Sequence, residues 1–467
     1  MVKEAAMSEI EVGYQKLVTS QRDFFRTGKT KQVDFRIQAL RKLQSEIKNR
    51  EAEIMEALKK DLNKSSFESY MTEIGMVLDE IRHCIAHVKK WAKPRNVRTP
   101  LAQFPSKSFT ISEPYGVVLI MSPWNYPFQL CIEPLIGAIA AGNCAVLKPS
   151  AYAAETSKVI NTLIRACFPK EFVTVIEGGR KENQGLLATE FDYIFFTGGV
   201  EVGKIVMEAA AKFLTPVSLE LGGKSPCIIE KSADINLAAK RVAFGKYLNA
   251  GQTCVAPDYV FVQKEVEEEF LKKLGMWVHK FFGEEPLKNE NLPKIINEHH
   301  YHRLLSLLEG EDIVIGGKGQ DNIRKIEPTV LKSVSTDANV MKEEIFGPIL
   351  PVITYQTIEE VIEYVTANPK PLACYLFTTN VQIEKKVLKH VSFGGGCVND
   401  TIIHLATPYM GFGGVGGSGM GSYHGFESFR TFSHSKSIVK KANWLDLPMR
   451  YHPYTEKNLK MIRKFLK

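Results

Sequence analysis

The feature that most constrains this fold is a series of short apolar segments between residues 117 and 221, separated by stretches with helical spacing. Short, continuous apolar strands that alternate with helices are typical of a parallel sheet covered on both faces. Such a sheet binds ligands at the carboxyl ends of its strands. We therefore predict an α/β unit with strands at 117–123, 144–149, 172–178, 192–198 and 217–221, and with helices near 127–140, 154–167, 182–188 and 201–213.

The rest of the chain predicts a second α/β unit and a separate extended arm. A chain of 467 residues is too long for one hydrophobic core, so more than one domain is expected. Residues 30–93 have helical spacing, whereas the proline-containing stretch 94–116 and the segment 431–441 are expected to be extended. The second unit spans 223–430, with expected strands at 226–230 and 259–263 and expected helices at 235–248 and 265–282.

Charge, hydropathy and cysteine usage exclude several classes of protein. The net charge of +8 is spread along the chain, so binding to nucleic acid is not expected. The chain has no apolar run of 18 residues, so no membrane span is expected, and residues 1–17 lack the apolar core of a signal peptide. The eight cysteines are scattered without a Cys-x-x-Cys pair, which favours a reducing compartment and a cytoplasmic protein. His299, His300 and His302 are expected to form the exposed start of a helix, and no metal site is predicted.

Polar residues and glycines gather at the ends of the predicted strands, and one cysteine lies in a loop of small and polar residues. Taken singly, each has a simpler explanation. An asparagine after a strand is usually a turn former, a glycine often serves helix packing, a glutamate between leucines can face solvent, and a loop cysteine is usually inert. The residues are Asn125, Lys148, Ser150, Gly198, Gly199, Gly203, Glu220 and Cys254.

Taken together, at these spacings, the residues resemble the aldehyde dehydrogenase superfamily. The resemblance runs from residue 24 to residue 451. It is strongest to the class 3 branch, which acts on fatty, aromatic and medium-chain aldehydes. The sequence CVAPDY from Cys254 onward and the ending SGMGSYHG support that branch. The matching stretches are 122-SPWNYPF-128, 147-LKPS-150, 196-FTGGVEVGK-204, 218-SLELGGKSP-226, 250-AGQTC-254, 343-EEIFGP-348 and 411-GFGGVGGSGMGSYHG-425.

The resemblance implies oxidation of medium-chain, long-chain or aromatic aldehydes to carboxylic acids. Cys254 would attack the aldehyde as a thiolate. The Asn125 side chain and the Cys254 backbone N–H would donate to the oxyanion that forms. Glu220 would activate the water that hydrolyses the thioester. Tyr126 and the loop 400–405 are expected in the wall of the substrate pocket.

The same resemblance implies a Rossmann-like cofactor domain that binds NAD or NADP. One position departs from the family pattern: many members carry an acid three residues after the lysine, where it binds the ribose hydroxyls, and this chain has Ala151. Glu155 is acidic but does not have that spacing. We therefore predict that NADP is accepted as well as NAD. The expected cofactor residues are Trp124, Lys148, Thr197, Gly198, Gly199, Val202, Gly203, Leu221, Gly222, Glu344 and Phe346.

The resemblance also implies how the chain is divided. Residues 1–93 and 114–221 are expected to form the cofactor domain, and 222–430 the catalytic domain. The segments 94–113 and 431–450 are expected to be bridging strands of a homodimer. Residues 451–467 form a tail with an apolar helical face. A docked or frayed surface helix is the preferred interpretation, and peripheral contact with a membrane surface, without spanning it, is the alternative.

Two alternatives stay open at this stage. A relative that transfers the acyl group to coenzyme A, or that runs as a reductase, would share most of these motifs. Glu220 argues against it, because coenzyme A-acylating relatives need no water-activating base. A binding or structural protein that kept the fold is the other alternative, and the set of Cys254, Glu220 and Asn125 argues against it.

Overall fold

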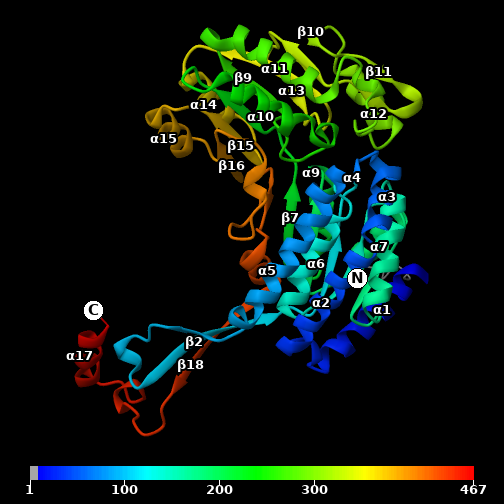
Figure 1. Ribbon diagram of the computed structural model, residues 1–467. Helices are drawn as coiled ribbons and strands as arrows, with labels where there is room; N and C mark the ends of the chain where they lie inside the picture. Colours follow the sequence, from blue (N-terminus) through cyan, green and yellow to red (C-terminus); the bar gives the residue numbers. More distant parts are fainter. Residues whose placement is uncertain (1–8, 467) are drawn as a thin grey trace, which may run out of the picture.

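The first unit is built on a six-stranded sheet (Figure 1). The structure is a computed structural model that describes residues 9–466, so residues 1–8 of the expected cofactor domain and Lys467 of the tail lie outside the described residues. The strand order is β17-β7-β6-β3-β4-β5, and all neighbours are parallel except β17. The strands are β3 (Val117–Met121), β4 (Cys144–Lys148), β5 (Val173–Val175), β6 (Tyr193–Gly198), β7 (Val217–Leu221) and β17 (Gly419–Met420).

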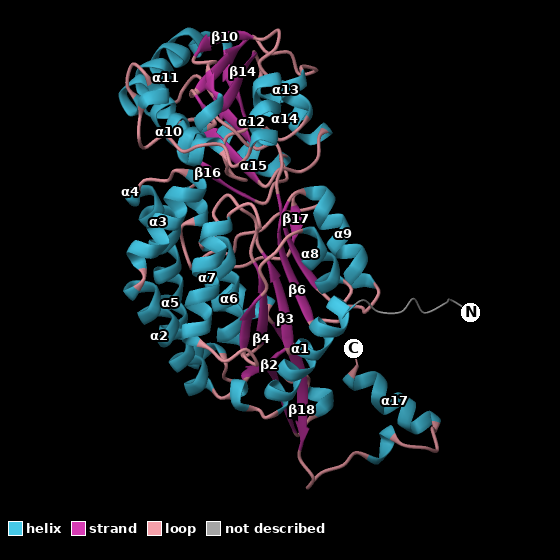
Figure 2. Cartoon of the chain, turned by 90° about the vertical axis from the view of Figure 1, so that its right-hand side faces the viewer, coloured by secondary structure: helices cyan, strands magenta, loops and turns pink. Residues whose placement is uncertain are grey.

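Helices cover both faces of this sheet, as the alternating sequence pattern predicts (Figure 2). Every residue of α6 is buried, because α2, α5 and α16 pack around it. This explains why the α6 sequence is apolar on all sides. The helices are α1 (Glu9–Arg26), α2 (Val33–Asn49), α3 (Glu51–Leu62), α4 (Ser66–Ser69), α5 (Gly75–Trp91), α6 (Gln129–Ala141), α7 (Ala154–Cys167), α8 (Arg180–Leu187), α9 (Val200–Ala211) and α16 (Gly425–Thr431).

The second unit is built on a seven-stranded sheet with the order β10-β13-β14-β9-β8-β15-β16. Only the edge strand β10 pairs antiparallel. The strands are β8 (Pro226–Ile229), β9 (Tyr259–Gln263), β10 (Asp312–Ile315), β13 (Thr329–Lys332), β14 (Ile349–Tyr355), β15 (Ala373–Phe377) and β16 (Gly395–Val398), beside a small β11 (Gly319–Gln320) and β12 (Lys325–Ile326) ladder. The helices are α10 (Ile235–Tyr247), α11 (Glu267–Phe282), α12 (Glu298–Ser306), α13 (Asn339–Lys342), α14 (Ile358–Ala367) and α15 (Val381–His390).

The extended arm is a three-stranded antiparallel sheet that projects from the two units (Figure 1). It consists of β1 (Arg95–Val97), β2 (Ser106–Pro114) and β18 (Ser433–Lys441). The last strand begins two residues later than the sequence predicts, because Thr431 still belongs to α16. The chain then ends in α17 (Glu456–Phe465), which lies beyond the arm and far from both large sheets.

None of the helices between residues 9 and 466 combines the length and the apolar character that a membrane span requires. The same part of the chain contains no group of three or more histidine, cysteine or acidic side chains that could hold a metal ion.

Candidate active site

The predicted catalytic residues meet where two hollows of the protein join. An apolar cavity lies between the two units. A glycine-lined cleft lies along the carboxyl ends of the strands of the six-stranded sheet. Cys254 and Glu220 line both hollows, and Asn125 lines the cleft. The family resemblance selected these three residues as a set, and they lie together in the fold.

Cys254 is placed by an unusual backbone just after α10. Asn249 and Ala250 both have a left-handed conformation, with φ values of 51° and 52°. Gly251 follows with φ of 73° and lies against the backbone of Gly347 too closely for a side chain. This tight packing fixes the loop against the segment that carries Glu344. Burial raises the pKa of the Cys254 thiol to about 12, and the carboxyls of Glu344 and Glu220 add to the rise.

Asn125 is held in place through its side-chain amide and its backbone carbonyl. Its side-chain amide donates to the backbone carbonyl of Gln252 at 3.0 Å, which ties it to the cysteine loop. Its own backbone carbonyl accepts from Lys64 Nζ at 3.0 Å and from the side chain of Asn249 at 2.8 Å. An amide nitrogen has two N–H groups, so one remains available to a ligand in the cleft.

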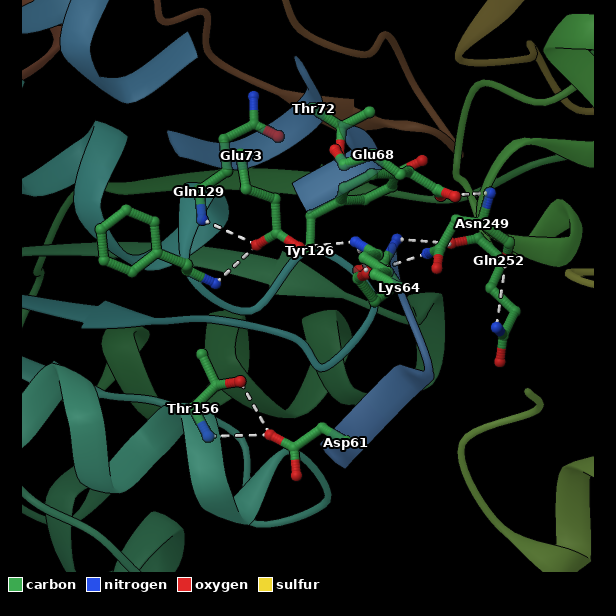
Figure 3. Close-up of polar contacts among 12 residues, drawn as sticks. Asp61, Lys64, Glu68, Thr72, Glu73, Tyr126, Gln129, Thr156, Asn249 and Gln252 are labelled. Atoms are coloured by element: carbon green, nitrogen blue, oxygen red, sulfur yellow. Dashed lines mark hydrogen bonds and ion pairs between the residues drawn. The ribbon is translucent and has the colours of Figure 1, made fainter. Parts of the chain in front are cut away.

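A buried ion pair supports this arrangement (Figure 3). Lys64 and Glu73 are fully buried, and Lys64 Nζ lies 2.5 Å from Glu73 Oε1. The other Glu73 oxygen accepts from the backbone N–H groups of Phe128 and Gln129, where α6 begins. The same lysine lies 3.9 Å from the ring centre of Tyr126. Sequence reasoning missed this pair, because both residues lie in a region rich in exposed lysines and glutamates.

Glu220 is buried on β7, so it does not have the solvent-facing position that a glutamate between leucines can have. It pairs with Gly419 of β17 and is 3% exposed. Within the described residues, neither carboxylate oxygen has a hydrogen-bond partner. Burial raises the pKa of Glu220 well above its usual value. An unpartnered carboxyl that lines both hollows is suited to bind or deprotonate a molecule that enters them.

The apolar cavity is lined mostly by methionine, leucine, isoleucine and aromatic side chains. Tyr126 lines it as expected, with its hydroxyl 2.6 Å from Thr253 Oγ1. From the loop 400–405, Ile402, Ile403 and Leu405 line it. Further wall residues that the sequence did not single out are Met71, Thr72, Met76, Phe244, Leu248, Phe412, Tyr423 and His424. They come from distant segments with ordinary apolar patterns, so only the fold reveals them.

Most of the predicted cofactor residues line the glycine-lined cleft. Glu344 lies directly against Gly222, where any side chain would collide with its carboxylate. Burial raises the pKa of Glu344 to about 8. Gly203 is different: it lines neither hollow, and a Cβ there would lie 2.6 Å from Leu221, so it allows α9 to pack on β7. The expected residues found in the cleft are Trp124, Thr197, Gly198, Gly199, Val202, Leu221, Gly222, Glu344 and Phe346.

The histidine cluster lies in the first turns of α12, but it is not wholly exposed. His299 and His302 are exposed, whereas His300 is half-buried and its ring is tilted against that of Trp124, with 5.4 Å between ring centres. Burial, with Arg303 and His299 nearby, lowers the pKa of His300 to about 4. His300 therefore forms part of the cleft wall as a neutral ring, which the sequence pattern did not indicate.

Lys148 lines a third hollow, which we call the cationic pocket. Its ammonium donates to the carbonyls of Pro149 and Gly178 at 2.9 and 2.7 Å. Val202 lines both this pocket and the cleft, so the two are neighbours. Ala151 is also in the pocket wall. Glu155 is not, because its carboxylate pairs with Lys158 at 2.6 Å on the outside of α7.

These residues fit a dinucleotide. Gly199 has open space where a side chain would be, so a phosphate group can approach the backbone closely at the start of α9. Thr197 Oγ1 is buried and has no partner among the described residues. Lys148 retains one donor for a hydroxyl or phosphate. A parallel sheet with such a cleft beside a cysteine and a buried carboxyl defines a dinucleotide-dependent oxidoreductase.

Comparison with known proteins gives the family. The pattern of the aldehyde dehydrogenase family matches residues 8–438. The 4,4′-diaponeurosporen-aldehyde dehydrogenase of Staphylococcus aureus is 48% identical over 446 residues, which cover 95% of this chain and 97% of that protein. The dimeric NADP-preferring aldehyde dehydrogenase of Canis lupus familiaris is 42% identical, with 94% and 97% covered. The chain therefore belongs to the aldehyde dehydrogenase family.

Solved structures agree with this assignment. The substrate-bound state of Staphylococcus aureus AldH has a TM-score of 0.96 and 47% identity, and covers 99% of this chain and 100% of its own. A betaine aldehyde dehydrogenase from Staphylococcus aureus in complex with NAD+ has a TM-score of 0.82 and 27% identity, with 92% and 89% covered. The predicted family, α/β fold and NAD(P)-dependent aldehyde dehydrogenase activity are thus confirmed.

Proposed function

We propose that Cys254, Glu220 and Asn125 oxidise an apolar aldehyde at the junction of the apolar cavity and the cleft. The observation that carries this proposal is that Cys254 and Glu220 line both hollows. An aldehyde in the cavity and a nicotinamide in the cleft would therefore reach the same sulfur atom. In this arrangement the bound dinucleotide supplies the hydride acceptor.

Cys254 is the nucleophile in this proposal. Its thiolate forms a bond with the aldehyde carbon, and the carbonyl oxygen becomes negatively charged. The free N–H of the Asn125 amide and the Cys254 backbone N–H donate to that oxygen. Loss of one such donor in other enzymes costs roughly 10²–10³ in rate. After oxidation, the acyl group is held on the sulfur as a thioester.

Glu220 is the base that completes turnover. A water molecule must attack the thioester, and a nearby carboxylate can remove a proton from it. Because burial raises the pKa of Glu220, the carboxyl is a stronger base than an exposed glutamate once it is ionised. The carboxylic acid product then leaves and the thiol is restored.

Different residues of this chain would hold different parts of the cofactor. Lys148 would contact the adenosine ribose, and Thr197 to Val202 would surround the phosphates. Glu344 would hold the nicotinamide ribose, with Trp124 and Phe346 beside the ring. Trp124 and Phe346 lie 5.3 Å apart in an edge-to-face arrangement, so each supports the other.

The apolar lining of the cavity supports medium-chain, long-chain or aromatic aldehydes as substrates. The 48% identical relative is named after 4,4′-diaponeurosporen-aldehyde, an apolar aldehyde of this kind, and the name applies to that relative. Burial of each methylene group stabilises the bound aldehyde by about 0.8 kcal/mol, so the apolar cavity should bind a longer chain more tightly.

We also propose the division of the chain and its assembly. Residues 9–93 and 114–221 form the cofactor domain, and 222–430 the catalytic domain. The β18 edge of the arm is free in one chain, which supports pairing with a second copy in a homodimer. Light scattering at micromolar concentration checks this, and a monomer mass would contradict it. The eight free cysteines support a cytoplasmic location.

An assay without coenzyme A tests the reaction. The protein is mixed with an aliphatic aldehyde and NAD or NADP, and the absorbance of the reduced nicotinamide is followed. Growth of that absorbance without coenzyme A supports hydrolysis of the thioester by water. Growth that requires coenzyme A would instead favour an acyl-transferring relative and would contradict the role of Glu220.

A further inference from the structure

The cationic pocket contains positive charge that the proposed reaction does not use. Arg180 is the first residue of α8, and its side chain is exposed and lines the pocket beside Lys148. Among residues 9–466, no carboxylate or carbonyl accepts a hydrogen bond from its guanidinium. A free guanidinium at the rim of a cavity presents up to five donors in a planar fork that matches a phosphate group.

Acidic side chains are absent from the described lining of this pocket. Its polar members are Ser122, Lys148, Ser150, Tyr152, Arg180, Asn183 and Gln184. Glu182 lies close to Lys148, but its carboxylate accepts from the Gly179 N–H at 2.6 Å and does not line the pocket. Glu155 is likewise held outside by Lys158. The pocket therefore carries two cations with no facing carboxylate.

Ala151 makes this charge accessible. A carboxylate at this position would bind the ribose hydroxyls and repel a phosphate on them. The alanine methyl group does neither, and it leaves the pocket wall between Lys148 and Arg180 without negative charge. Lys148 donates to two carbonyls at the floor of the pocket, whereas Arg180 at the rim is exposed and has no such acceptor among the described residues.

We infer that Arg180 binds the 2′-phosphate of NADP and gives the enzyme a preference for NADP over NAD. The inference rests on the proposed placement of the adenosine ribose beside Lys148. A 2′-phosphate carries nearly two negative charges at neutral pH. With Arg180 as a fork and Lys148 as a point charge, the phosphate gains a charge-assisted contact that NAD cannot make.

Equilibrium binding of two small nucleotides tests Arg180 without any aldehyde turnover. Adenosine 2′,5′-bisphosphate and AMP differ only in the 2′-phosphate, and calorimetry gives both dissociation constants. In Arg180→Gln, binding of the bisphosphate should weaken about 10- to 100-fold, the range of one charge-assisted contact. AMP should change less than about threefold, because it lacks the group that Arg180 binds. Arg180→Lys should recover part of the loss.

Matched variants separate the possible explanations. Lys181→Gln removes the same charge at the next position, which is exposed and lies outside the pocket lining, and it should leave both constants nearly unchanged. Ala151→Glu should weaken the bisphosphate and strengthen AMP. In the unmodified protein, added salt should weaken the bisphosphate more than it does in Arg180→Gln.

Two results would overturn the inference in different ways. In the first, Arg180→Gln weakens the binding of both nucleotides equally or of neither, while Lys148→Met weakens the binding of both. The adenosine then lies where we place it, and Arg180 does not bind the 2′-phosphate. If Lys148→Met also changes neither constant, the placement of the adenosine is itself wrong.

Discussion

The apolar cavity and the cationic pocket select their ligands by opposite means. The cavity is lined by apolar side chains, buries Glu220 and half-buries Cys254, so the charged forms of both residues are disfavoured. The pocket carries Lys148 and Arg180 without a facing acid in the described structure. One region therefore discriminates by apolar area and the other by charge. The difference shows why the reactive groups lie at the junction, where an apolar substrate site meets a polar cofactor site.

Replacement of Cys254, which lines the apolar cavity, by serine should cause the largest loss of activity. The hydroxyl of serine is scarcely ionised near neutral pH, and a dry cavity disfavours its anion further. Turnover should fall on the order of 10⁴-fold or more, as for loss of a nucleophile in other enzymes. Cofactor affinity should stay within about twofold, measured by quenching of protein fluorescence. A large loss of cofactor affinity would mean that the variant disturbs the cleft rather than the chemistry.

Replacement of Lys64 by methionine should disturb the junction of the cavity and the cleft, because Lys64 donates to the carbonyl of Asn125 in the cleft and lies over the ring of Tyr126 in the cavity wall. The change leaves Glu73 buried without its cation. The free energy of unfolding should fall by about 3–5 kcal/mol, measured by urea denaturation. The double variant Lys64→Met, Glu73→Gln should recover part of it. Lys60→Met, whose partner Glu56 is exposed, should cost less than about 1 kcal/mol.

The pH dependence of Cys254 alkylation tests whether the surroundings of this thiol at the junction disfavour its charged form. A raised thiol pKa means that less thiolate is present at any pH below it. With a pKa of about 12, the rate with iodoacetamide in the cofactor-free protein should keep rising by about tenfold per pH unit up to about pH 9.5. A free cysteine levels off near pH 8.5–9. Peptide mass spectrometry follows the modified residue, and a plateau near pH 8 would show that the thiol is ionised more easily than its burial indicates.

Chain length of the substrate should give the smallest and most graded effect. If the cavity acts through apolar area, kcat/KM for straight-chain aldehydes should rise by about fourfold per added methylene until the cavity is full, from about 0.8 kcal/mol each. Steady-state kinetics with a series of aldehydes measures this slope. Ala406→Trp, in the exposed part of the cavity wall, should flatten the series for the longest chains only. A series without any slope would contradict discrimination by apolar area.

The strands of the first unit could be predicted from sequence for a physical reason. A strand buried on both faces needs a continuous apolar run. Val117–Met121 is such a run and is followed by Ser122, and the run in Cys144–Lys148 ends at the lysine. The same pattern placed Glu220 and Asn125 at or near strand ends. Their convergence on Cys254 followed from the family resemblance, because the sequence does not show which strands are neighbours.

Other parts of the site carry no local signal. Gly251, which follows the left-handed residues Asn249 and Ala250, packs against Gly347, nearly a hundred residues away. Lys64 and Glu73 resemble ordinary surface residues of a charged helical region until the fold buries them. His300 was expected at an exposed helix start, and only contact with Trp124 makes it part of the cleft. Such features arise from tertiary contacts, which a pattern along the chain does not contain.

In the proposed reaction, Cys254 carries the acyl group and Glu220 releases it to water. The most direct measurement is the intact mass and peptide map of Glu220→Gln after mixing with an aldehyde and NADP. Steady turnover should fall by roughly 10²–10⁴-fold, the usual contribution of a general base. A burst of reduced cofactor, about one per active site, should survive, and Cys254 should carry the mass of the acyl group. Wild-type turnover without any acyl adduct on Cys254 would contradict the account.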